Sequence, residues 1–141
     1  MIKKFKTFES SKLTDTINEI EDIFKNLDLD YDLEVMVSEA NVSQHHLHSE
    51  VSLKDGDLIR TKIKVIIVTI KFLRYPGPNF GKDLSELVKR VVSFGLKFDM
   101  AKIPFNLPGY TYEDIEKMFH INGSNRWDLD KINGTWIRFI V

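Results

Sequence analysis

Residues 58–73, LIRTKIKVIIVTIKFL, decide the fold because their pattern changes half-way along. In the first half basic and aliphatic side chains alternate, which is typical of a strand with one face in water. In the second half both faces are apolar, which indicates a strand covered on both sides or a bulge that switches its faces. We expect the cover to be the C-terminal region, although a partner would bury the same side chains. A protein interface here would use Ile66, Val68, Ile70 and Phe72.

Three elements are predicted before this strand. Residues 10–27 place apolar side chains every three or four positions, which predicts an amphipathic helix. Residues 31–38 alternate in polarity and predict a strand with one buried face. Residues 46–53 predict a second strand, joined to the third by a three-residue loop at 54–56 that pairs apolar with apolar side chains. A turn near residues 39–43 would place the first two strands side by side.

The elements after the strand complete the predicted fold class. Asp83 and Glu86 form a capping box for a second helix, which extends to about Phe98. A short helix is expected to begin at Thr111, and residues 133–134, Asn-Gly, to turn a C-terminal hairpin. Helix, three strands, helix, short helix and hairpin make an α+β domain with a largely antiparallel sheet.

Composition limits the class of protein. The chain has 141 residues and no cysteine, so one domain without disulfides is expected, at residues 10–141 after a basic leader at 1–9. Lys and Arg total 20 against 21 Asp and Glu, so no overall charge favours nucleic acid or acidic membranes. The longest apolar run, VIIVTI, is far below the roughly 20 residues that span a bilayer. The N-terminus lacks the features of a secretory signal, so no membrane association or signal-directed secretion is expected.

His46 and His48 raise the question of a metal site. Their spacing of two places both on one face of the predicted strand, which zinc sites do use. The predicted register sets Lys64 and Lys62 opposite them, and cations disfavour a bound dication. We therefore expect no metal or other cofactor, since only His120 or a distant carboxylate could supply a third ligand. A metal-dependent enzyme that uses the two histidines remains the weaker alternative.

Nucleic-acid binding is the stronger alternative. The order helix, three antiparallel strands, helix over residues 10–98 resembles the double-stranded-RNA-binding domain. That family carries a Gly-Pro-x-His loop and a lysine cluster at the start of its last helix. Here the loop is DGD and the helix begins GKDLSE, with the single Lys82, so both sets of phosphate contacts are missing. Binding would instead use a basic strip made of Arg60, Lys62, Lys64, His46 and His48.

The N-terminus carries a second resemblance. The segment MIKKFKTFES is similar to the basic Phe-x-x-Phe-x-Glu leader of small accessory proteins of large contractile-tailed phages, through Phe5, Phe8 and Glu9. In that family the leader can direct packaging and is cut after the glutamate. The family pattern has an aliphatic residue two positions before the glutamate, where this chain has Thr7.

No phosphate-binding loop, zinc-protease helix or nucleophile motif occurs in the sequence, so we predict no catalytic residue. The resemblance implies an accessory protein for virion assembly or host takeover, in the host cytoplasm or the virion. We therefore expect it to act by binding a phage or host protein, with self-association as a second mode.

Overall fold

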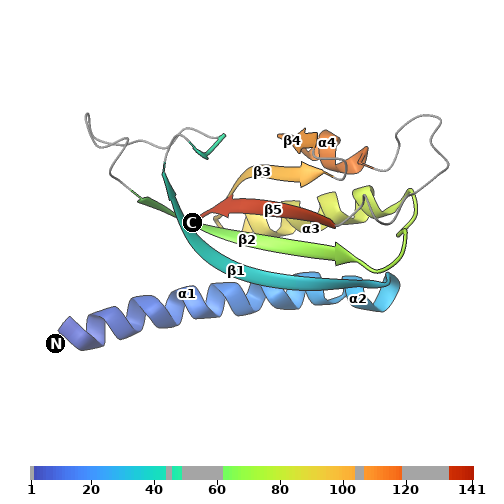
Figure 1. The fold of residues 1–141 in the computed structure, drawn as a ribbon. Coiled ribbons are helices and arrows are strands. Elements are labelled where there is room, and N and C mark those ends of the chain that lie inside the picture. Colours follow the sequence, from blue (N-terminus) through green and yellow to red (C-terminus); the bar gives the residue numbers. More distant parts are fainter. Residues whose placement is uncertain (1, 44–45, 49–61, 104–106, 119–133) are drawn as a thin grey trace.

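The computed structural model describes residues 2–43, 46–48, 62–103, 107–118 and 134–141, and all statements below concern these ranges. It confirms the predicted α+β class with an antiparallel sheet. No helix in these ranges is long and apolar enough to cross a membrane. The elements, drawn in Figure 1, are α1 (Ile2–Lys25), α2 (Leu27–Asp30), β1 (Leu33–Ser43), β2 (Lys62–Phe72), α3 (Phe80–Ser93), β3 (Lys97–Ile103), β4 (Leu107–Gly109), α4 (Tyr112–Glu116) and β5 (Gly134–Ile140).

The sheet has five strands in the order β1-β2-β5-β3-β4, and each neighbouring pair is antiparallel. The strand latest in the sequence, β5, therefore lies in the middle of the sheet (Figure 1). Because β2 and β3 both run antiparallel to β5, they are parallel to each other. The unit β2–α3–β3 is thus a split βαβ unit with β5 inserted between its strands.

One face of the sheet, here called the helix face, carries the main core. Every described helix contributes to it, and alternate residues of the strands point into it because successive side chains of a strand point to opposite faces. We call the other side the open face. The helix residues of the core are Ile20, Ile23, Phe24, Leu27, Phe80, Leu84, Val88, Val91 and Ile115.

The apolar half of β2 is buried on its helix face, whereas on its open face Val65 is buried and Ile67 and Thr69 are only half-buried. Helices α1 and α3 cover its helix face, whereas the C-terminal strand β5 pairs with its edge. On the open face Val65 packs with Leu47, Ile63 and Ile140. The four side chains of the expected protein interface are between 0% and 6% exposed within the chain itself: Ile66, Val68, Ile70 and Phe72.

The predicted three-stranded order is wrong in its first half. Strand β1 continues through residues 39–43, where a turn was expected, and pairs directly with β2 from Leu33–Phe72 to Ser43–Lys62. Residues 46–48 lie outside the sheet. The rest of the predicted second strand and its loop fall outside the described residues.

The helix boundaries also differ from the prediction. Helix α1 begins at Ile2, so most of the predicted leader belongs to it. Helix α3 begins at Phe80, one turn before the predicted capping box, and ends at Ser93. Gly95 follows with φ +104°, a left-handed conformation that glycine tolerates and that ends many helices. The chain then enters β3, where the sequence predicts the end of a helix and a loop.

The C-terminal hairpin is a second correction. Strand β5 pairs with β2 along one edge and with β3 along the other, so no edge remains for a hairpin partner. The glycine of the expected turn starts the strand instead. Gly134 has φ +151°, and a Cβ there would lie 2.1 Å from the Ile70 carbonyl oxygen, so a residue without a side chain is needed.

Helix α4 agrees with its prediction. The Thr111 hydroxyl accepts a hydrogen bond from the Asp114 N–H at 3.1 Å, and the Asp114 carboxylate accepts from the Thr111 N–H, which together make a capping box. The Tyr110 N–H also donates to this carboxylate and is the main cause that holds the pKa of Asp114 below its usual range.

Candidate protein-binding surface

The structure separates the residues of the predicted basic strip. Lys62 and Lys64 alternate with Ile63 and Val65, whose side chains point to the open face, so both lysines point to the helix face. Lys62 Nζ donates to Ser43 Oγ at 3.1 Å. The two histidines flank Leu47, which packs on the open face, and Arg60 falls outside the described residues. The four described residues therefore do not form one surface.

His46 and His48 hold the 46–48 segment against the open face. Arg138 Nη2 donates to the His46 carbonyl oxygen at 2.7 Å. The His48 ring stacks on the Tyr110 ring, with centroids 3.9 Å apart. No group of three histidine, cysteine or carboxylate side chains that could hold a metal occurs in the described part of the chain, and His120 lies outside it.

A buried ion pair lies on the open face, next to the 46–48 segment. Arg138 Nε lies 2.7 Å from Asp99 Oδ2, and the two side chains are only 10% and 0% exposed. A β-bulge in β3 at Asp99 and Met100 places two residues opposite Arg138, and such bulges redirect a side chain. The guanidinium also lies over the Trp136 ring, 5.4 Å from its centroid. The pair thus joins β3, β5 and the 46–48 segment.

The rest of the open face is less covered. The strand register places four side chains in one row across the open face. The row runs from Met36 through Thr69 and Trp136 to Lys102. Met36 is 61% exposed, and Trp136 is half-buried. No described helix packs on this side. The half-buried or exposed side chains of this open face include Glu34, Met36, Ser38, Ile67, Thr69, Lys71, Lys97, Met100, Lys102 and Trp136.

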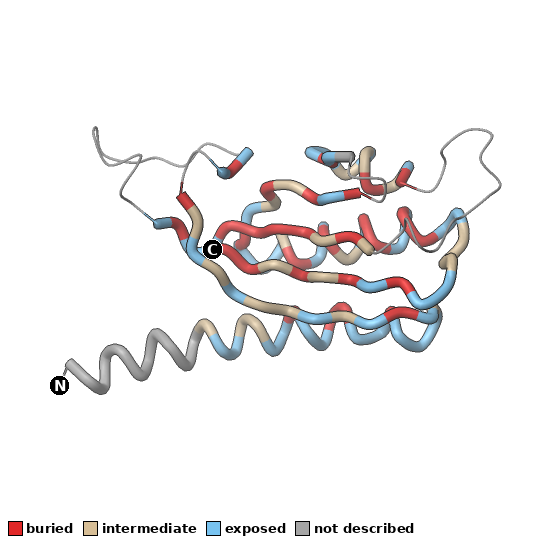
Figure 2. Tube along the Cα trace, in the orientation of Figure 1, coloured by how far each residue is buried: buried red, intermediate tan, exposed pale blue. Residues whose placement is uncertain are grey.

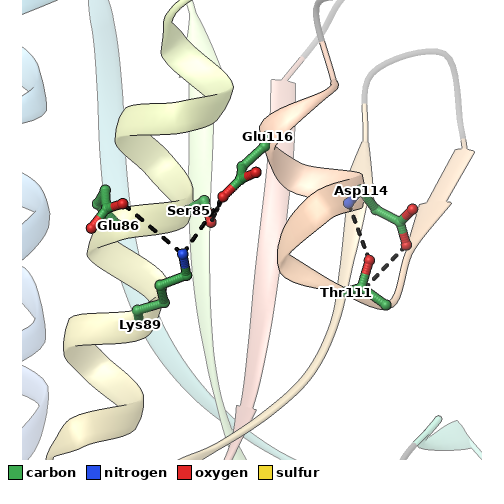
Figure 3. Close-up of polar contacts among 6 residues, drawn as sticks. All are labelled: Ser85, Glu86, Lys89, Thr111, Asp114 and Glu116. Atoms are coloured by element: carbon green, nitrogen blue, oxygen red, sulfur yellow. Dashed lines mark hydrogen bonds and ion pairs between the residues drawn. The ribbon is translucent and has the colours of Figure 1, made fainter.

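A polar cluster of Ser85, Lys89 and Glu116 joins α3 and α4 (Figure 3). Ser85 Oγ donates to Glu116 Oε1 at 3.3 Å, and Lys89 Nζ lies 3.6 Å from the same oxygen. Ser85 is fully buried, so a substrate cannot reach its hydroxyl. A Cβ at Gly81 would lie 2.4 Å from the Ile115 carbonyl oxygen, which shows how closely the two helices approach. The cluster therefore links α3 to α4 and is no nucleophile site.

A second polar contact ties α3 to the segment before β1. The Tyr31 hydroxyl donates to the Asp83 carboxylate, and the Tyr31 ring meets the Phe80 ring edge-on, with centroids 5.1 Å apart. Burial, followed by the bond to the Asp83 carboxylate, raises the pKa of Tyr31 to about 12. Asp83, predicted as a helix cap, serves instead as the acceptor for this tyrosine.

A groove lies along the outer edge of the sheet. It has a volume of about 400 Å³ and runs between β1 and the carboxylate-rich side of α1 and α2. Figure 2 shows that β1 is fully buried only at its two ends, whereas β5 is buried along most of its length. The residues that line the groove are Glu21, Asp22, Lys25, Asp28, Val35, Met36 and Val37.

Sequence reasoning missed Asp99, Trp136 and Arg138. The segment GTWIRFI alternates, and an arginine inside a strand whose neighbours are apolar requires a buried anion. That signal was present. Asp99, the partner of Arg138, could not be recognised, because the sequence predicts a helix that ends near Phe98.

No protein-family model, curated protein or solved structure matches the chain.

Proposed function

We propose that the protein acts by binding another protein through the open face, without chemistry of its own. The observation that carries this proposal is the one-sided placement of the helices. It leaves the indole of Trp136 and the thioethers of Met36 and Met100 on a face that no described helix covers. Trp and Met are enriched at protein interfaces, where they supply large contact areas.

The buried ion pair supports the same proposal. Arg138 is held by the Asp99 carboxylate, the His46 carbonyl and the Trp136 ring, so the part of the face around Trp136 is held in place. A surface that is already ordered loses less conformational entropy on binding. The exposed cation Lys102 lies beside Trp136 and favours a partner with an acidic group there, whereas Lys71 has Glu34 opposite it in β1.

The biological setting of this binding rests on the N-terminal resemblance. Phe5, Phe8 and Glu9 favour a phage-type accessory protein that serves virion assembly or host takeover, in the host cytoplasm or the virion. The nucleic-acid alternative is not favoured, because Lys62 and Lys64 point to the helix face and do not form one surface with the 46–48 segment. The enzyme alternative has no observation in its favour among the described residues.

An affinity capture tests the proposal. Tagged protein is incubated with lysate of the cells that naturally make it, with and without nuclease, and captured proteins are identified by mass spectrometry. We expect nuclease-resistant capture that Lys102→Glu reduces and Lys82→Glu does not, since both lysines are exposed but Lys82 lies on α3. Capture that disappears with nuclease, or that Lys102→Glu leaves unchanged, would contradict the proposal.

A further inference from the structure

Among the described residues, no strand pairs with the outer edge of β1. β1 is the first strand in the order of the sheet, and β2 is its one described neighbour. The Leu73 N–H donates to the Asp32 carbonyl oxygen at 3.0 Å, which makes this a hydrogen-bonded pair of the same ladder. Such pairs alternate in an antiparallel ladder, so the even-numbered residues of β1 bond to β2. Val35 and Val37 therefore direct their N–H and C=O groups outward.

The same two valines line the groove beside α1. Their side chains point to the helix face and pack against its core, while Met36 between them points to the open face. The opposite wall carries Glu21, Asp22 and Asp28 with one cation, Lys25. Outward-directed backbone groups, an accessible hollow and an excess of negative charge thus occur at one place.

We infer that this groove binds an extended peptide segment of a partner protein, which adds to β1 as a further strand and directs Lys or Arg side chains toward α1. The inference rests on the proposed protein-binding function and names the chemistry of one contact. Strand addition at a free edge supplies affinity through backbone hydrogen bonds and specificity through alternate side chains. Residues opposite Val35 and Val37 would be basic, and the residue opposite Met36 would be apolar.

Charge decides between this occupant and a second copy of the chain. The charged residues of β1 are Glu34 and Glu39, so a copy that paired through its own β1 would bring no cation to the carboxylates of α1. An acidic peptide would be repelled by the same wall. A segment with alternating basic and apolar residues would direct its basic side chains to the carboxylates of α1 and its apolar side chains to the open face beside Met36.

The test uses a labelled peptide, Ser-Lys-Val-Arg-Leu-Lys-Ser, and fluorescence anisotropy with the full chain. The control peptide, Ser-Glu-Val-Glu-Leu-Glu-Ser, keeps the alternation and reverses the charge. We expect the basic peptide to bind at least about tenfold more tightly than the acidic one, since several exposed charge pairs of up to about 1 kcal/mol each are made or lost. Equal binding of the two peptides would overturn the inference.

Two variants test whether the peptide binds in the groove. Glu21→Lys should weaken binding roughly fivefold, whereas Glu19→Lys should not, because Glu19 is exposed on α1 but does not line the groove. Val37→Pro removes one outward N–H at an edge position where proline is tolerated, and should abolish binding in a chain that circular dichroism shows to be folded. Unchanged affinity in Glu21→Lys would overturn the inference even if the proline variant failed to fold.

The outcomes separate this inference from the proposed function. If Val37→Pro and Glu21→Lys still capture the natural partner while Lys102→Glu does not, the open face is the binding surface and the edge inference is wrong. If the wild type self-associates in sedimentation and Val37→Pro does not, a second copy occupies the edge, which also overturns it. Loss of natural capture in both edge variants would support it.

Discussion

Replacing Arg138 by methionine should cost a large part of the folding free energy. Methionine keeps much of the side chain's length but leaves the Asp99 carboxylate without its guanidinium in a site where that carboxylate is fully buried. Breaking a buried ion pair by removing one partner costs about 3–5 kcal/mol. A domain of this size has a total stability of about 5–15 kcal/mol, so the change is large. With a urea slope of about 2 kcal/mol/M, the unfolding midpoint should fall by roughly 1.5–2.5 M.

The matched control is Arg74→Met. Arg74 also faces a carboxylate, that of Asp32 at 3.6 Å, but these two side chains are 79% and 50% exposed. An exposed pair contributes about 0–1 kcal/mol, so this variant should unfold close to the wild type. Urea unfolding of both variants, followed by circular dichroism, makes the comparison. Equal midpoints for Arg138→Met and Arg74→Met would refute the reasoning from burial.

A double variant separates the charge from the packing. Arg138→Met combined with Asp99→Leu removes both ions, and replacing a buried pair by apolar side chains is often neutral or stabilising. We therefore expect the double variant to recover most of the loss. A loss equal to the sum of the two single variants would show that the two side chains do not interact.

Three further predictions test other parts of the fold. Val68→Asp should unfold the chain, because the site is fully buried and an unpaired carboxylate there costs several kcal/mol; a native circular dichroism spectrum would contradict the cover by α1 and α3. Gly134→Ala should lower the urea midpoint more than Gly95→Ala, since both glycines have positive φ but only at Gly134 would a Cβ meet a backbone oxygen. Tyrosinate absorbance should show a group titrating near pH 12 that is absent from Tyr31→Phe. Because the folded-state pKa of Tyr31 is raised, its contribution to stability is present below about pH 10 and is lost as pH rises through about 12, and the phenylalanine variant should lack this loss.

Local patterns predicted the elements better than their arrangement. The alternation of β1 and the two-sided apolar half of β2 follow from short-range polarity, and both are present. The sequence predicts a turn at residues 39–43 because Glu39, Asn41 and Ser43 resemble turn residues. Ala40 and Val42 continue the alternation of polar and apolar residues, but their side chains are small.

The sheet order could not be derived from the sequence, because the pairing of β5 with β2 and β3 joins segments far apart in the chain and leaves no local pattern. The candidate surface shows the same limit. Arg138 implies a buried anion, but Asp99 lies 39 residues earlier and meets it only through a bulge. Gly95 is a typical helix end that would have placed Asp99 in a strand.

The central position of β5 has a consequence for synthesis on the ribosome. Until residues 134–140 have left the exit tunnel, β1 and β2 can form only a hairpin, and β3 and β4 a second ribbon without a shared neighbour. Two-stranded ribbons are marginal in water, and β2 would meanwhile expose apolar side chains. Pairings as distant as Val65 with Ile140 also make folding slow, since long-range contacts close late. The nascent chain therefore stays open to aggregation and to chaperone capture until residues 134–140 have emerged and joined the two halves of the sheet.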